Sequence, residues 1–121
     1  MPKLFTLQGR LSRIGYLKWS IVLMLLMIVF FLLIFGSFVL AADSNNAVFI
    51  IAPFLFLISA VLWGMVAHIC ITVRRLHDCG MPGLLSLLLF TGVGQILSII
   101  LLFIPGTQGD NQYGPAPESG Y

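Results

Sequence analysis

Charged side chains are scarce in this sequence of 121 residues: six are lysine or arginine and four are aspartate or glutamate, 8% of the total. A soluble domain usually carries about 25% charged residues. With 60% hydrophobic residues, the chain has too little polar surface to stay dispersed in water as a monomer. The length allows one compact unit, and the composition predicts that its solvent is lipid.

Other absences exclude further classes of protein. The net charge is only +2 and the basic residues form no long stripe, so we do not expect a nucleic-acid binder. Two cysteines do not make a disulfide framework. The sequence has no G-x-S-x-G, no H-E-x-x-H and no phosphate-binding loop, so we expect neither an enzyme nor a bound cofactor.

Three long apolar runs account for most of the chain. They cover residues 17–42, 47–73 and 84–104. A helix needs roughly 20 apolar residues to cross a bilayer core, so the first two runs are long enough to span with some tilt. Buried helices of a soluble protein would need polar outer faces, which these runs lack. A cleaved signal peptide is a second alternative for the first run, but a signal core has only about 7–15 apolar residues.

The third run is interrupted near its middle by Thr91, Gly92, Gly94 and Gln95. Two glycines and a glutamine allow a helix to break or to pack closely on a neighbour. Two structures are therefore open for residues 84–104: one spanning helix, or a re-entrant hairpin that returns the tail to its starting side. The predicted fold is an all-α integral membrane protein, a small bundle of three apolar segments.

The basic residues all fall on one side of the predicted hairpin of the first two spans. They are Lys3, Arg10, Arg13, Lys18, Arg74 and Arg75. The link between the spans, residues 43–46, has no lysine or arginine. The positive-inside rule therefore places the amino terminus and the link after the second span in the cytoplasm.

An interfacial helix is predicted ahead of the first span, over residues 3–19. Its apolar stripe at helical spacing consists of Leu4, Leu7, Leu11 and Ile14. Arg10 and Arg13 would lie on a neighbouring face that suits lipid phosphates.

A polar loop is predicted over residues 74–83, where Arg74, Arg75, His77 and Asp78 interrupt the apolar sequence. A membrane anchor explains the arginines, whose stems reach to lipid headgroups, but it explains the histidine and the aspartate poorly. If the second helix continues to Asp78, the negative end of the helix dipole disfavours this carboxylate. An arginine of the same turn, or one from the N-terminal segment, would offset that cost.

Two histidine–cysteine pairs look like metal ligands: His68 with Cys70, and His77 with Cys79. Side chains two residues apart on a helix point to nearly opposite sides, so His68 and Cys70 could not share an ion unless the helix broke there. We therefore expect no metal site.

The tail, residues 105–121, changes in composition to glycine, proline, asparagine, glutamine and serine. This predicts turn-rich coil without a helix. The tail is either disordered or, because Asn111 and Tyr113 stand beside Gly114 and Pro115, a folded turn laid against a surface.

Three stretches share their order and spacing with one protein family. They are G-R-L-S-R at residues 9–13 with Tyr16, R-R-L-H-D at residues 74–78 with Gly80, and P-G-T at residues 105–107 followed by Gly109, Asn111, Tyr113 and G-P-A-P at residues 114–117. Together they resemble the DUF 805 family (domain of unknown function) of small bacterial inner-membrane proteins. The chain departs from the family at Leu17, where members often carry tryptophan. The resemblance implies a bacterial cytoplasmic (inner) membrane protein, and it implies no activity.

The resemblance also favours one shared polar cluster on the cytoplasmic side. Its expected members are Arg10, Arg13, Arg74, Arg75, His77, Asp78, Asn111 and Tyr113. The leading function is a non-enzymatic scaffold or accessory module, in contact with membrane lipids and with a membrane-protein partner or a second copy. An oligomeric transporter or channel would instead need polar residues at membrane depth, and the plausible set is His68, Thr72, Gln95 and Ser98. A lipid-headgroup enzyme would use His77 and Asp78.

Overall fold

The computed structural model of the chain describes residues 5–42 and 48–118. Its elements are α1 (Arg13–Ala41), α2 (Val48–Asp78), the 3-10 helix η1 (Gly83–Phe90) and α3 (Val93–Phe103). Over the described ranges no strand is present, and the β-type pairing is an isolated bridge between Asn111 and Gly114. The prediction of an all-helical chain is confirmed.

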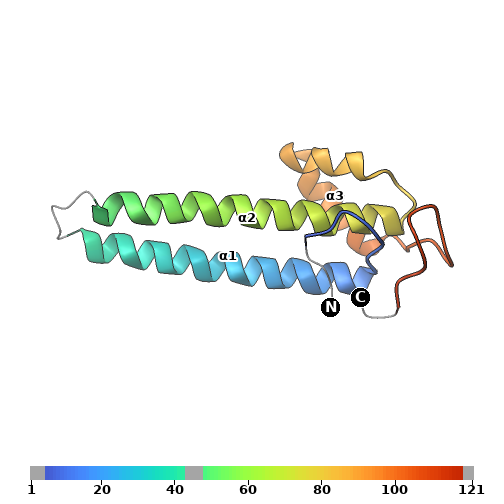
Figure 1. Cartoon of the computed structure of the whole chain (residues 1–121), viewed down its shortest axis with the longest axis horizontal. Helices are drawn as coiled ribbons and strands as arrows, with labels where there is room; N and C mark the ends of the chain where they lie inside the picture. Colours follow the sequence, from blue (N-terminus) through green and yellow to red (C-terminus); the bar gives the residue numbers. More distant parts are fainter. Residues whose placement is uncertain (1–4, 43–47, 119–121) are drawn as a thin grey trace.

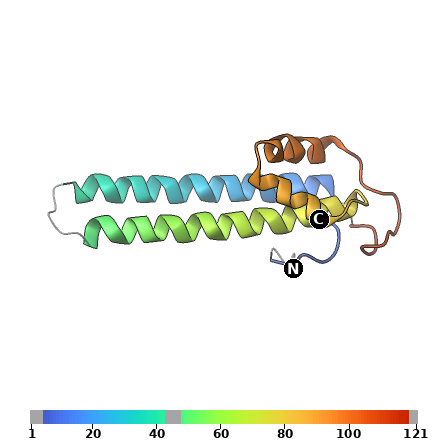
Figure 2. The same ribbon diagram turned by 90° about the horizontal axis from the view of Figure 1, so that it is seen from above.

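The two long helices, α1 and α2, lie side by side along the whole length of the molecule (Figures 1 and 2). They have 29 and 31 residues, which at 1.5 Å per residue gives lengths of about 44 Å and 46 Å. A bilayer with its headgroup regions is about 40–45 Å thick. Both helices are long and apolar enough to cross a membrane, with mean hydropathies of 3.0 and 2.4.

The prediction of an interfacial helix over residues 3–19 is wrong. Residues 5–12 are not helical, and α1 begins at Arg13 after Ser12, whose hydroxyl accepts a hydrogen bond from the Gly15 amide at 3.1 Å. Leu11 is buried and its amide donates to the Arg74 carbonyl at 3.0 Å, whereas Leu7 is exposed. The apolar side chains of this segment therefore point in different directions and form no stripe. Leu4 lies outside the described residues.

The predicted polar loop at residues 74–83 is shorter than expected, because α2 continues through Asp78. The helix ends in a turn closed by Gly80, whose positive φ of 73° suits glycine. The Gly80 amide donates to the His77 carbonyl at 3.1 Å, and the Met81 amide donates to the Leu76 carbonyl at 2.9 Å. These bonds satisfy carbonyl groups that the last helical turn leaves open.

The third apolar run forms a hairpin of two short helices, so a single helix over residues 84–104 is excluded. η1 ends at Phe90, Thr91 is extended, and α3 begins at Val93. Gly94 is required at the turn because a side chain there would collide with the backbone of Leu89. With 8 and 11 residues, η1 and α3 are each about 16 Å long, too short to cross a bilayer core of about 30 Å.

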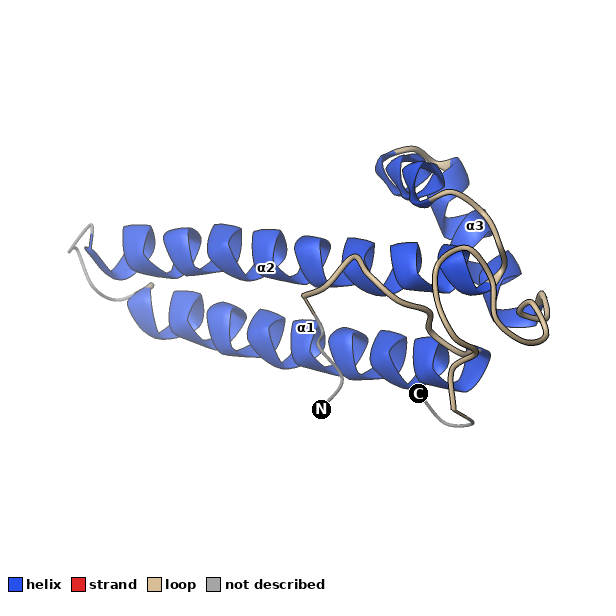
Figure 3. Ribbon diagram, turned by 45° about the vertical axis from the view of Figure 1, so that its right-hand side comes forward, coloured by secondary structure: helices blue, strands red, loops and turns tan. Residues whose placement is uncertain are grey.

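The buried core lies in one half of the molecule. It consists of Leu11, Tyr16, Leu23, Ala67, Ile71, Leu76 and Leu101, with Trp19, Cys79, Met81, Leu85, Leu97 and Leu102 packed against it. All of these residues come from the start of α1, the end of α2 and the η1–α3 hairpin, together with the segments that flank them. Figures 1 and 2 show the hairpin beside only this half of the long helices. Figure 3 shows it projecting to one side, next to the loops of the tail and the N-terminal segment.

Candidate functional site

Asp78, the last residue of α2, is the centre of a buried charged site. Its Oδ1 accepts a hydrogen bond from Arg10 Nε at 3.0 Å, and its Oδ2 accepts one from Arg75 Nη1. The exposed fractions are 3% for Asp78, 6% for Arg10 and 0% for Arg75. We call these three residues the clasp. Two positive charges against one negative charge leave an excess of +1, which offsets the negative end of the α2 dipole.

Arg75 joins the end of α3 and the N-terminal segment to α2. Its Nε donates to the Leu101 carbonyl at 2.9 Å, and its Nη2 donates to the Ile104 carbonyl at 2.5 Å. These carbonyls belong to the last turn of α3, where the helix itself provides no partner. A longer contact of 3.4 Å runs from Nη1 to the Leu11 carbonyl. One guanidinium group therefore fixes three separate segments of the chain.

Arg10 joins the N-terminal segment to the tail. Its Nη2 donates to the Thr107 carbonyl and its Nη1 to the Gly109 carbonyl, both at 2.5 Å. The tail is also bonded directly to α2: the Thr107 amide and hydroxyl both donate to the Asp78 carbonyl, at 2.7 Å and 3.0 Å. Gly106 passes so close to Asp78 that a side chain at position 106 would overlap the carboxylate.

The second half of the tail is a folded turn laid against the end of α2. Asn111 Nδ2 donates to the His77 carbonyl at 2.9 Å, and Asn111 Oδ1 accepts from the Tyr113 amide at 2.9 Å. The Tyr113 ring stacks on the His77 ring, with centroids 4.0 Å apart and planes 4° from parallel. At one end of the molecule, the N-terminal segment thus meets the end of α2, the end of α3 and the tail.

Comparison with known proteins gives one match. The sequence profile described as protein of unknown function (DUF805) matches residues 4–115, nearly the whole chain. The chain belongs to the DUF805 family. No curated protein and no solved structure matches it. The matched range contains the first two of the three shared stretches and the third as far as Pro115, and the family description names no activity.

The structure distinguishes between the arginines that the sequence of this DUF805 protein left as alternatives. Of the two N-terminal arginines, Arg10 reaches Asp78, and Arg13 is exposed at the first residue of α1. Of the two in α2, Arg75 bonds to the carboxylate, and the backbone carbonyl of Arg74 accepts from Leu11. His77, Asn111 and Tyr113 lie beside the clasp.

Sequence reasoning missed Gly106 and Thr107 as members of the site. The signal was present, because P-G-T at residues 105–107 is one of the three stretches shared with the family. Neither residue carries a charge, so a search for charged and aromatic groups passed over them. Their contribution is a backbone that approaches Asp78 closely and a donor pair for its carbonyl.

Two of the four polar residues proposed for a transport path in the DUF805 chain, Thr72 and Ser98, donate to carbonyls of their own helices, and the Thr72 hydroxyl also lies 3.5 Å from that of Tyr16. Thr72 is fully buried and donates to the His68 carbonyl at 2.8 Å, and Ser98 donates to the Gly94 carbonyl at 3.1 Å. Gln95 is exposed on α3. These contacts give no support to a shared polar path.

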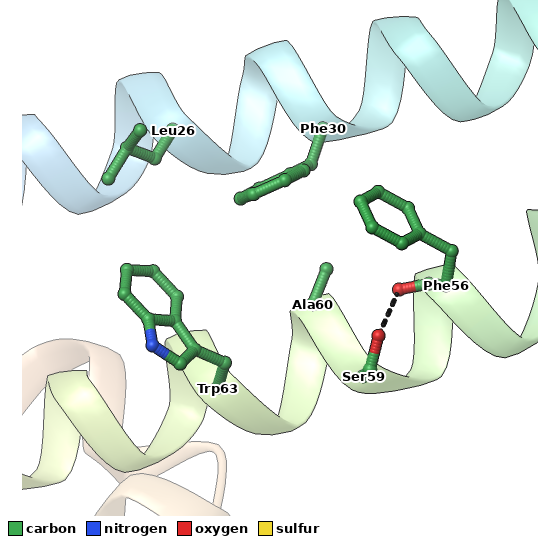
Figure 4. A pocket seen from close by; sticks show the side chains of 6 residues that line it. All are labelled: Leu26, Phe30, Phe56, Ser59, Ala60 and Trp63. Carbon is green, nitrogen blue, oxygen red and sulfur yellow. Dashed lines mark hydrogen bonds between the residues drawn. The ribbon is translucent and has the colours of Figure 1, made fainter.

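A groove of about 390 Å³ lies elsewhere, between α1 and α2 (Figure 4). Its lining residues are Leu26, Phe30, Phe56, Ser59, Ala60 and Trp63. The Ser59 hydroxyl donates to the Phe56 carbonyl of the same helix at 2.8 Å, so the lining is effectively apolar.

Cys79 follows the clasp directly and is half-buried with a free thiol. Burial raises the pKa of the Cys79 thiol, against the opposing effect of the nearby Arg75 charge. Within residues 5–42 and 48–118, no group of three or more His, Cys, Asp or Glu side chains is placed to hold a metal ion.

Proposed function

We propose that this DUF805 protein crosses the bacterial cytoplasmic membrane twice and acts there as a non-enzymatic scaffold or accessory subunit. Membrane insertion is supported by the exposure of its apolar surface. Only 11% of the most apolar window of α1, and 11% of that of α2, is buried within the chain. A core helix of a soluble protein of the same composition would be mostly buried, because such apolar surface is costly in water.

The orientation follows from the basic residues. The described ones are Arg10, Arg13, Lys18, Arg74 and Arg75, all in the half of the molecule that contains the clasp. The link between α1 and α2, residues 43–46, contains no lysine or arginine. The positive-inside rule therefore assigns the clasp and the tail to the cytoplasmic side.

The scaffold proposal is supported by one observation: the polar groups of the clasp are hydrogen-bonded to one another and to the backbone of the chain. Both oxygens of Asp78 accept from arginines, and the remaining donors of Arg10 and Arg75 bond to backbone carbonyls. A catalytic carboxylate needs a free oxygen within hydrogen-bond reach of a substrate. The geometry instead suits a joint that holds four segments of the chain as one rigid cytoplasmic face, and His77 is engaged by Tyr113 in the same face.

Site-specific photo-crosslinking in cells tests this proposal. A photoreactive residue at Gln112, which is exposed on the clasp face, should yield one discrete adduct, with either a membrane protein or a second copy of the chain. The same probe at Leu40, exposed at the far end of α1, is the matched control and should yield no such adduct. The adduct should weaken with Asp78→Asn, which removes the carboxylate that orients Arg10, the donor to the Thr107 and Gly109 carbonyls of the tail. Labelling at Leu40 but not at Gln112 would contradict a cytoplasmic scaffold face.

A further inference from the structure

The helices of the chain are distributed unequally along its long axis. At the clasp end, η1 and α3 lie beside α1 and α2, whereas the far half contains the two long helices alone (Figures 1 and 2). Both ends of the hairpin are fixed at the clasp end. Residue 82 follows the turn that closes α2, and the Leu101 and Ile104 carbonyls bond to Arg75. The hairpin therefore starts and finishes on the same side.

The hairpin has the dimensions and the surface of a segment that enters one leaflet. Its two helices are each about 16 Å long, close to half of a bilayer core of about 30 Å. Apart from Gln95 in α3 and Thr91 in the turn, its exposed side chains are apolar, and they include Leu84, Leu87, Phe90, Ile96, Ile99 and Phe103. No charged residue occurs in η1 or α3. Such a surface belongs in hydrocarbon, next to the apolar surfaces of α1 and α2.

From these observations we infer that the chain is a membrane wedge that binds preferentially to bilayers whose clasp-side leaflet is convex. The inference rests on the membrane insertion proposed above. An α-helix with its side chains is about 10–12 Å across, so each helix displaces roughly 100 Å² of leaflet area. Four helices in one leaflet and two in the other give the clasp-side leaflet about twice the displaced area. In a convex leaflet the lipid headgroups are spread farther apart. This lowers the free energy needed to insert the larger helix cross-section into that leaflet.

The partner is thus the lipid bilayer itself, selected by its shape. The polar turns at the clasp end and the position of Arg13 and Lys18 near the start of α1 keep that end at the headgroups. This prevents the hairpin from sliding toward the far leaflet. Consequently the two orientations of the chain in a curved membrane differ in free energy, and in a flat membrane they do not.

Insertion into vesicles of different size tests the wedge. The chain with Gln112→Cys, in a Cys70→Ala and Cys79→Ala background, is added from detergent to preformed vesicles of phosphatidylcholine and phosphatidylglycerol. Small sonicated vesicles have a convex outer leaflet, and large extruded vesicles are nearly flat. The fraction of the introduced thiol labelled by an impermeant maleimide, before and after lysis, reports the clasp-out orientation. We expect the ratio of clasp-out to clasp-in chains to be at least about twofold higher in small vesicles, because only the clasp-out orientation places the larger helix cross-section in the convex leaflet.

A pair of variants isolates the hairpin. Leu87→Asn with Phe90→Asn makes the exposed face of η1 polar and should remove the dependence on vesicle size, whereas Leu40→Asn with Val48→Asn at the far end should retain it. Flotation of the vesicles with bound chain is measured first. A chain that fails to float refutes membrane insertion itself. A chain that floats with equal orientation ratios in both vesicle sizes refutes the wedge alone. Self-crosslinking through Leu87→Cys, with no dependence on size, would show that a second copy covers the hairpin and would also overturn the wedge.

Discussion

Replacing Asp78 with asparagine tests whether the clasp stabilises the fold. The amide has nearly the same shape as the carboxylate, so packing around position 78 is preserved while the negative charge is removed. Arg10 and Arg75 then remain side by side with no counter-charge, and both are almost completely buried. Two like charges in a partly dry site repel each other, and neither can move to water without breaking its bonds to backbone carbonyls.

The expected cost follows from the burial of the group. Removing one partner of a buried ion pair typically costs about 3–5 kcal/mol, because a charge is stranded. An exposed pair would cost only about 0–1 kcal/mol. Asp78 is 3% exposed and contacts two arginines, so we expect a loss of about 3–5 kcal/mol in the free energy of unfolding. Glu118→Gln, at an exposed position in the tail, should stay within about 0.5 kcal/mol of the parent.

Thermal and denaturant unfolding in detergent measures this loss. Trp19 packs against the buried core next to the clasp, so its fluorescence in a Trp63→Phe background reports on this half of the molecule. A double-mutant cycle then identifies the pairing. Arg10→Gln should cost less in the Asp78→Asn background than in the parent, by about 1–3 kcal/mol.

Arg13→Gln is the matched control for this cycle, since it is the same substitution three residues away on an exposed side chain. Its cost should add to that of Asp78→Asn within about 0.5 kcal/mol. Two results would refute the reasoning: an Asp78→Asn variant that unfolds with the parent, or equal coupling of Arg10 and Arg13 to Asp78. Either result would mean that the charged stretch is a solvated membrane anchor.

Two further predictions concern the tail and the thiol. Gly106→Ala should lower the free energy of unfolding by about 1–3 kcal/mol, because the added methyl group overlaps the Asp78 carboxylate. Gly92→Ala is the control: the space around Gly92 is open, so this variant should change the free energy of unfolding by less than about 1 kcal/mol. Equal unfolding midpoints for the two variants would contradict the close approach of the tail. Burial raises the pKa of the Cys79 thiol. In a Cys70→Ala background, the pH midpoint of its alkylation rate should therefore lie above the ordinary value of about 8.5, and it should return to that value in denaturant. A midpoint at or below about 8.5 in the folded chain would refute this prediction.

Several features of this protein are determined by the sequence alone, because their signals are local. The length and hydropathy of the first two apolar runs predict the two long helices α1 and α2. The unfavourable position of a carboxylate at a helix C-terminus was enough to predict that Asp78 needs an arginine. Each of these conclusions depends on neighbouring residues and on a single helix, so no knowledge of the fold was required.

Only the tertiary structure decided which arginines serve Asp78 and how the ends of the chain are arranged. The spacing of the leucines in the sequence is the same whether residues 5–12 form a helix on lipid or an irregular segment, so their non-helical course could not be predicted from it. The burial of Leu11 against α2 determines that course. The glycines of the third run permitted both a span and a hairpin. The hairpin forms because the carbonyls at the end of α3 bond to Arg75, and this contact requires the chain to return to the side from which it started.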